Sequence, residues 1–556
     1  MASFLNPIRL SPLEAFMPRT YVRQMYCFPT SNPQAVDTLR RGVVALAQEI
    51  PYILSCVIRE ESGFVVVSKP CQRPEDIFSC RDLSTSINYA SLRVDNFPPA
   101  AFLHPEITPR DALPPFPDQP AVFAARASLV EGGLILCVAV HHYVTDITGF
   151  GSLLKVWASC CRDESPSDTI HFSKDWMNRE PLFASSDPVS QNPELDGVPD
   201  LLHIKAEDET TRITGSAVGD ISAGQQKARV NNYKTAIFYF PQHHLQSLKS
   251  AVNAHLESLE PGSWASTGDI LGSLLWSAIA IEATEAPLTS PDLDPNEPGS
   301  ILKNDVDAAD AQISTLSFPV QFRSLLRPKP LPADFLGAAF IMTSAKILHG
   351  ELRSLLAPIP ISSDNKPRNS VSETRCPTGP KSESEPRSKP EVFEVKTSTD
   401  TGSDSDSVVN IPILAKTTLT IRHSIQAVDD VAVRRVLSYL ETHPPSNANN
   451  KPSLLTLGPP RRVSGGSGVT VVSWADQGVY DLSWGTTLGK CEAVRLPKLP
   501  SRRDPIVLPR RVPPSAVVNG DDGGGLEVIM SYEEDVMQRL IECPVMQRFA
   551  VLRCLS

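Results

Sequence analysis

Two adjacent histidines and an aspartate are the residues of this chain with the clearest capacity for chemistry. His141 and His142 follow an uninterrupted apolar stretch at residues 134–140, and Asp146 comes four residues after His142. Because apolar side chains in that stretch do not alternate with polar ones, it predicts a strand buried on both faces. An imidazole at the end of such a strand has an ordinary pKa near neutrality, which suits a general base.

The residues after Asp146 predict a helix, since apolar side chains recur at helical spacing through Trp157. The motif therefore lies at a strand-to-helix corner, where a short turn can hold the ring of His142. The same spacing also occurs by chance, and a histidine at the end of a strand often has only a structural role. The motif alone leaves both interpretations open.

A second motif ends in Trp484-Gly485. Together with the histidine motif, it resembles the BAHD acyltransferase family, in particular fungal transferases of the trichothecene 3-O-acetyltransferase type that acylate secondary metabolites. The two family signatures are His-His-x-x-x-Asp-Gly and Asp-Phe-Gly-Trp-Gly. Ile147 stands in place of the glycine of the first signature. In the second, either Asp481 or Ser483 takes the place of the aspartate, and both alignments stay open.

Weaker matches to the family follow the family order along nearly the whole chain. They include residues 10–28, 266–276 and 331–337, and the segment Val-Gln-Phe-Arg-Ser that contains Arg323. No single match is specific, whereas their common order is. Ala338 departs from the family, which has an asparagine at that place.

The resemblance implies an α/β fold of two chloramphenicol-acetyltransferase-like domains, each a mixed β-sheet flanked by helices, with the site in a tunnel between them. We expect an N-terminal domain at residues 1–205, a crossover linker at 206–231 and a C-terminal domain at 232–556. Residues 357–410 are rich in Ser, Pro, Lys, Glu and Asp. Because such a composition buries too little apolar surface to offset its chain entropy, this insert is predicted to be disordered.

The resemblance also implies a role for each site residue. His142 is expected to be the general base that takes a proton from an acceptor hydroxyl or amine. The acceptor then attacks the thioester of acyl-CoA directly, in a ternary complex without an acyl-enzyme. Asp146 is expected to pair with Arg323 and fix the histidine turn, while Trp484 and Gly485 shape the CoA side of the tunnel. An ordinary surface arginine and a buried core tryptophan are the alternatives for Arg323 and Trp484.

The composition of the chain limits the kinds of partner and cellular setting that we expect for it. The net charge of -11 and the lack of a basic stripe argue against general nucleic-acid binding. The 11 cysteines show no Cys-x-x-Cys pattern, which favours a reducing, cytoplasmic setting over a disulfide framework or a metal site. No apolar stretch reaches the roughly 18 residues that suggest a membrane span. We expect a monomer with acyl-CoA, most simply acetyl-CoA, as co-substrate, and no metal or permanently bound cofactor.

Two other functions stay open. The first is a condensation-type acyltransferase of the same fold, which takes a thioester bound to a carrier protein. The second is an inactive binding scaffold, which the departures at Ile147, Ser483 and Ala338 favour. Retention of His142 and Asp146 favours an enzyme instead.

Overall fold

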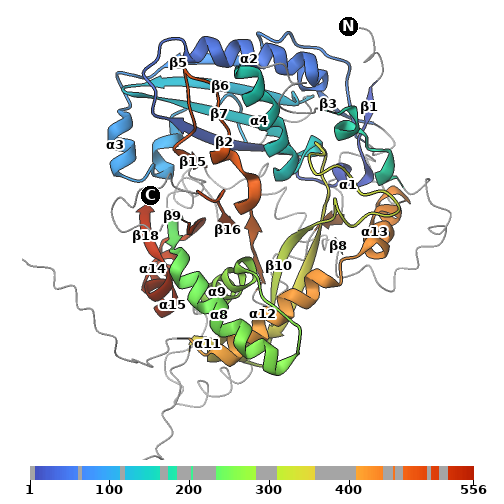
Figure 1. Ribbon diagram of the computed structural model, residues 1–556, viewed down its shortest axis with the longest axis vertical. Helices are drawn as coiled ribbons and strands as arrows, with labels where there is room; N and C mark the ends of the chain where they lie inside the picture. Colours follow the sequence, from blue (N-terminus) through green and yellow to red (C-terminus); the bar gives the residue numbers. More distant parts are fainter. Residues whose placement is uncertain are drawn as a thin grey trace, which may run out of the picture.

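Two five-stranded β-sheets with helices packed on them form most of the protein (Figure 1). This α/β architecture is the predicted fold class. The computed structural model describes residues 7–60, 65–112, 119–162, 173–183, 202–204, 233–283, 310–356, 409–442, 455–457, 468–497, 503–511 and 524–556.

The first sheet carries the histidine motif at the end of its central strand. All its pairs are antiparallel except β5 with β6, and β7 is buried along its whole length, as predicted. Helices α2 and α4 lie on one face and α3 packs on the other (Figure 1). The strands, in sheet order, are β15 (Ala493–Arg495), β2 (Tyr21–Phe28), β7 (Gly133–His141), β6 (Phe123–Val130) and β5 (Phe78–Asp82). The helices are α2 (Ala35–Glu49), α3 (Tyr89–Val94) and α4 (Ile147–Cys161).

The second sheet lies below the first in the view of Figure 1 and packs against the green and red helices. Its strands, in order, are β14 (Val472–Ser473), β16 (Arg503–Val507), β17 (Leu526–Glu533), β9 (Tyr233–Phe240) and β18 (Val551–Leu555). Its helices are α8 (Gln242–Leu259), α9 (Thr267–Glu282), α14 (Glu534–Glu542) and α15 (Pro544–Phe549).

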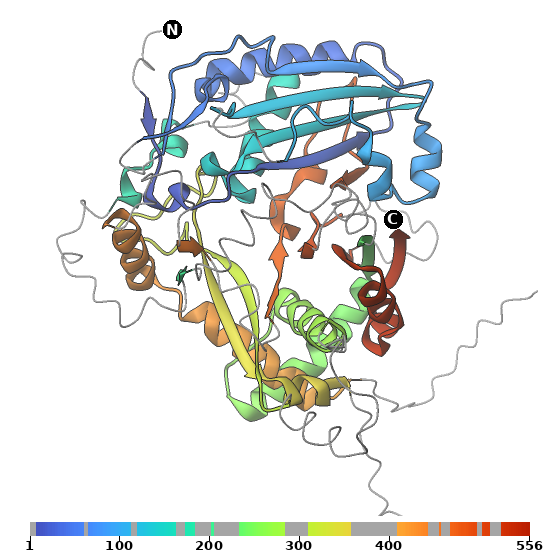
Figure 2. The same cartoon turned by 180° about the vertical axis from the view of Figure 1, so that it is seen from behind.

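A long hairpin supplies a third structural unit, seen in yellow in Figure 2. Strands β10 (Ile313–Gln321) and β11 (Phe340–Leu348) pair antiparallel, and residues 322–339 connect them. Strand β13 (Gly468–Thr470) adds to β10 in parallel. The remaining helices are α1 (Pro12–Ala15), α11 (His349–Leu356), α12 (Ile411–Gln426) and α13 (Asp430–Thr442). Two small sheets hold β1 (Ile8–Arg9), β3 (Val57–Arg59) and β4 (Val65–Val67), and β8 (Leu202–Ile204) with β12 (Leu455–Leu457).

Several helices begin at side-chain caps that satisfy their first amide groups. Ser266 and Asp269 form a reciprocal capping box at the start of α9. Asn410 caps α12, whose second position is a proline that has no amide hydrogen to satisfy. Each such cap stabilises a helix by about 1 kcal/mol.

The strand β15 lies far along the chain, yet it pairs with β2 in the first sheet. Its residue Arg495 forms a buried ion pair with Glu527 of β17, with N–O distances of 2.8 and 3.0 Å. A buried ion pair therefore joins the two large sheets, in addition to the connecting chain. The boundary between residues 205 and 232 stays a prediction, and both the linker at 206–231 and the insert up to residue 408 lie outside the described residues.

Ten cysteines fall in the described part of the chain, and all of them are free thiols. The Sγ atoms of Cys56 and Cys71 approach to 3.0 Å. Among the described residues, no helix is both long enough and apolar enough to cross a membrane.

Candidate active site

The turn after β7 presents His142. The strand ends at His141, a 3₁₀ turn spans His142–Val144, and Asp146 caps the start of α4. The backbone amide of His142 donates to the Thr20 carbonyl at 2.8 Å, which extends the pairing of β7 with the chain before β2. The strand-to-helix corner is thus present where the sequence predicts it.

A hydrogen bond fixes the tautomer of His142. Its Nδ1 lies 3.1 Å from the carbonyl oxygen of Thr145. Because a carbonyl oxygen can only accept, Nδ1 must carry the hydrogen, and Nε2 of the neutral ring keeps its lone pair. Burial lowers the pKa of His142 below its usual 6.5, although the backbone carbonyls and Asp146 oppose that effect. The half-buried ring is therefore neutral near neutral pH, with an unprotonated Nε2.

The neighbouring His141 has a different environment. It is fully buried, and the rings of Tyr21 and Tyr143 pack edge-on against it at 5.3 and 4.8 Å between centroids. Its Nδ1 accepts a hydrogen bond from the Tyr143 amide at 3.3 Å. Burial, aided by the charge of Arg19, lowers the pKa of His141 to about 3. This imidazole is a neutral part of the core.

Asp146 lies at the centre of a buried ion pair. The guanidinium of Arg323 donates to both carboxylate oxygens, at 2.7 and 2.8 Å. The side chain of Asp146 is 2% exposed and that of Arg323 is 8% exposed. The amides of Gly149 and Ala339 also donate to the carboxylate, each at 2.9 Å. Burial acts to raise the pKa of Asp146, but Arg323 and these amides together lower it below its usual value. Arg323 is not a surface residue, so that alternative is wrong.

The carboxylate of Asp146 also connects the histidine turn to residues 335–339, which lead into β11. Arg323 donates to the carbonyl oxygens of Phe335 and Gly337 at 3.0 and 2.9 Å. The first turn of α4 approaches the same segment so closely that a Cβ at Gly149 would lie 2.3 Å from the Leu336 carbonyl oxygen. The glycine that this chain has at 149 is therefore required by packing.

A second buried ion pair next to this turn was missed by the sequence analysis. Glu14, which is not exposed, accepts two hydrogen bonds from Nε of Arg179 at 3.0 and 3.1 Å. Glu14 belongs to an N-terminal segment that resembles the family, but nothing in the pattern around Arg179 signals a partner. The two residues are 165 positions apart, and only the folded chain brings them together.

The second motif packs on the far end of α4. Trp484 is 1% exposed, and its ring contacts those of Trp157 and Phe28 edge-on, at 5.4 and 5.8 Å between centroids. Gly485 has a φ of +87°, and a Cβ there would lie 3.2 Å from the Cys161 carbonyl oxygen. The motif is therefore built into the core around α4.

The side chain of Asp481 is 78% exposed, and its carboxylate lies 4.0 Å from Nζ of Lys490. This aspartate is therefore a surface residue and not part of the core. The backbone at Ser483 contacts α4 instead, because its carbonyl accepts a hydrogen bond of 2.6 Å from Arg162.

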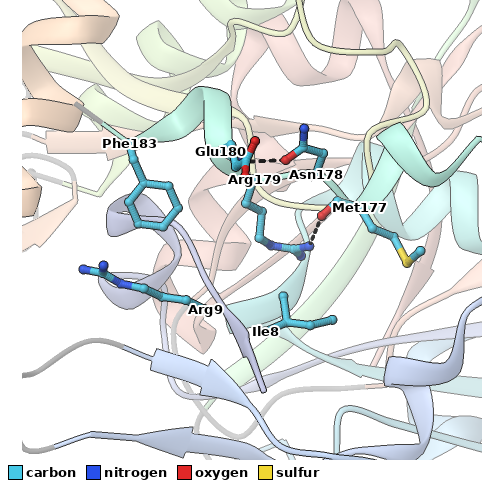
Figure 3. Close-up of a pocket in the computed structure, with 7 residues that line it drawn as sticks. All are labelled: Ile8, Arg9, Met177, Asn178, Arg179, Glu180 and Phe183. Atoms are coloured by element: carbon cyan, nitrogen blue, oxygen red, sulfur yellow. Dashed lines mark hydrogen bonds between the residues drawn. The ribbon is translucent and has the colours of Figure 1, made fainter. Parts of the chain in front are cut away.

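A pocket of about 530 Å³ opens beside Arg179 (Figure 3). The guanidinium of Arg9 lies over the ring of Phe183 at its rim, 5.0 Å from the centroid. Neither His142 nor Trp484 lines it. The described residues contain no cluster of three or more His, Cys, Asp or Glu side chains that could hold a metal ion.

Comparison with known families agrees with the histidine motif. A model of the trichothecene 3-O-acetyltransferase-like N-terminal domain matches residues 20–161, and the model of the Transferase family matches residues 93–357. The first match covers β2 to α4, and the second covers the histidine turn and Arg323. The chain belongs to the BAHD-type acyltransferase family. It is therefore an enzyme of the acyltransferase class, as the sequence predicts.

Three relatives of this chain come from fungi. The O-acetyltransferase ptmV of Penicillium ochrochloron is 22% identical over 98% of this chain and 96% of its own length. The O-acetyltransferase astG of Aspergillus oryzae is 25% identical over 62% of this chain and 71% of its own length. Trichothecene 3-O-acetyltransferase TRI101 of Fusarium sporotrichioides is 26% identical over 45% of this chain and 52% of its own length.

Solved structures show the same fold. The TRI101 of F. graminearum, in a complex with coenzyme A and T-2 mycotoxin, superposes with a TM-score of 0.67 over 99% of this chain and 100% of that one, at 18% identity. Vinorine synthase superposes with a TM-score of 0.52 over 98% and 94% of the two chains, at 14% identity.

Replacing Gly149 by alanine is expected to destabilise this acyltransferase by about 1–3 kcal/mol, because the added Cβ would overlap the Leu336 carbonyl and Thr145 Oγ1. Gly272 in α9 is the matched control, since a Cβ there would meet nothing closer than 3.6 Å. Alanine at that helical position is expected to stabilise by up to about 1 kcal/mol. Thermal unfolding of the two variants measures the difference, and equal stability contradicts the close approach at Gly149.

Proposed function

We propose that this enzyme transfers an acyl group from acyl-CoA to a hydroxyl or amine of a small secondary metabolite, with His142 as the general base. The observation that carries the proposal is the fixed tautomer of His142 on a turn held by the Asp146–Arg323 pair. Its fungal relatives are named O-acetyltransferases, and a solved structure with the same fold holds coenzyme A. Acetyl is therefore the acyl group that we propose.

The reaction can proceed in a single ternary complex. As the acceptor oxygen or nitrogen attacks the thioester carbonyl carbon, its proton moves to Nε2 of His142. The tetrahedral intermediate then collapses, the carbon–sulfur bond breaks, and the imidazolium returns the proton to the departing CoA sulfur. No covalent acyl-enzyme is needed. The thiols of Cys160 and Cys137 are poor nucleophiles, because burial raises their pKa values to about 11 and about 12.

Asp146 and Arg323 act on the turn rather than on substrate in this proposal. Their charges neutralise each other in the core. Their other bonds reach the amide of Gly149 in α4, the backbone of residues 335–339 and the side chain of Gln321. We assign Trp484 and Gly485 to the CoA side of the site, where they act by shaping the core around α4. The free thiols of the described cysteines fit a reducing, cytoplasmic setting, and we propose that the enzyme works there as a monomer.

The intact turn argues against the inactive scaffold. The change at Ala338 leaves the backbone amide in place, and that amide donates to Glu14 at 3.2 Å. Ile147 is half-buried against the apolar cluster around Trp474, so it is accommodated without disturbing the cap at Asp146. A carrier-bound thioester remains the alternative acyl donor.

The His142→Ala variant is expected to lose at least about 100-fold in turnover, since general bases contribute 10²–10⁴-fold. The assay follows thiol release from acetyl-CoA, first with water and then with a panel of alcohols and amines. His423→Ala is the control, because that histidine is exposed and pairs with Glu260 on α8's C-terminal side. Full activity in His142→Ala would remove the proposed base, and release only from a carrier-bound acetyl group would favour the condensation-type alternative.

The pH dependence follows from the lowered pKa of His142. Only the neutral imidazole accepts a proton, so kcat/KM is expected to be constant above the pKa and to fall as pH drops through it. The midpoint of this acidic limb is expected below 6.5, the ordinary value for histidine. A kcat/KM profile for acetyl-CoA between pH 5 and 8 measures it, and a midpoint above 6.5 would contradict the buried neutral base.

A further inference from the structure

We propose that Glu14 and Arg179 are a second positioning pair for the His142 turn, and that this pair works in concert with Asp146 and Arg323. The inference rests on the proposed function, because it concerns the residues that hold its base in place. It assigns a role in the reaction to the N-terminal segment, which lies far from the histidine motif in sequence.

Arg179 reaches the turn directly. Its Nη2 donates to the carbonyl oxygen of Val144 at 3.1 Å, while Nη1 donates to its own segment at the Met177 carbonyl, also at 3.1 Å. Figure 3 shows the guanidinium extended toward Met177 beside the pocket. With Nε bound to Glu14, the guanidinium spans three separate parts of the chain.

Each of three successive residues in the turn is held by a different group. Val144 is held through its carbonyl by Arg179, Thr145 through its carbonyl by the ring of His142, and Asp146 through its carboxylate by Arg323. The peptide plane between Val144 and Thr145 cannot rotate while the first carbonyl is bound. Since the Thr145 carbonyl orients the His142 ring, Arg179 fixes the direction of Nε2 through two linked bonds.

Both carboxylates also bind the same backbone segment. Glu14 accepts from the amide of Ala338 at 3.2 Å, and Asp146 accepts from the amide of Ala339 at 2.9 Å. The ring of Phe335 lies 5.8 Å from each guanidinium, so the two cations share one aromatic partner. The fit is tight, because a Cβ at Gly337 would lie 2.7 Å from Glu14 Oε1. The two ion pairs therefore hold residues 335–339 and the histidine turn as one unit.

Stability alone does not explain a buried pair at this place. Desolvation of two charges offsets most of their attraction, and apolar residues of similar volume often stabilise a core as well or better. What an arginine adds is directed hydrogen bonding from a rigid, planar group. Here those bonds end on the turn that carries the base.

The test is Arg179→Lys, compared with Arg495→Lys as a matched control. Lysine keeps a positive charge beside Glu14, but one ammonium group cannot reproduce the guanidinium's bonds to Glu14, Met177 and Val144. Arg495 is an equally buried arginine, paired with Glu527, and none of its described bonds involves the histidine turn. Both variants are expected to lower the melting temperature.

Two readouts separate positioning from stability. In Arg179→Lys, kcat per folded enzyme is expected to fall about 10- to 100-fold, with KM for acetyl-CoA within about twofold. Amide hydrogen exchange is expected to speed up in peptides that cover residues 141–150 and 335–340. In Arg495→Lys, kcat per folded enzyme and exchange in those two regions are expected to match the unmodified protein.

The proposal is overturned if amide hydrogen exchange and kcat per folded enzyme in Arg179→Lys match those of Arg495→Lys. The pair of Glu14 and Arg179 would then have only a structural role. Faster exchange around His142 in Arg179→Lys alone supports positioning even if no acceptor is turned over. A protein that shows this exchange pattern but no thiol release in any form would contradict the proposed function and not the positioning role.

Discussion

The buried carboxylate of Asp146 is the group on which the rest of the site depends. Because this carboxylate is buried away from water, its oxygen atoms need hydrogen-bond donors from the protein itself. Arg323 supplies two, and the amides of Gly149 and Ala339 supply the others. These donors come from α4 and from the two ends of the connection between β10 and β11. A single charge therefore joins the histidine turn to a hairpin that lies far from it in the sequence.

Helix α4 connects this ion pair to the second family motif. Its first residues are fixed at Asp146, and its last turn receives the second family motif, with Gly485 against the Cys161 carbonyl and Arg162 bound to Ser483. The two motifs are 342 residues apart between His142 and Trp484, but one 15-residue helix separates them in space. Small residues stand where α4 meets another backbone, because no side chain fits there.

Individual strands and helices were predictable from the sequence. The contacts between residues far apart in the chain were predictable only in part. An unbroken apolar run specifies a buried strand whatever surrounds it, and β7 follows that rule. The alignment of Asp481 could not be decided, since its exposure depends on how the chain turns beyond Tyr480. Arg179 gave no signal, because the energy of a buried pair comes from a partner 165 residues away rather than from its neighbours.

The contrast between the two histidines shows how position alone separates structure from chemistry. Successive side chains at a strand end point to opposite sides. One ring is packed against Tyr21 and Tyr143 and has a pKa of about 3, so it stays uncharged near neutral pH. The other has its Nδ1 hydrogen committed to the Thr145 carbonyl and stays only half-buried. A neutral, oriented and accessible imidazole can take a proton from many different acceptor molecules, because each needs only to place its hydroxyl or amine hydrogen near Nε2.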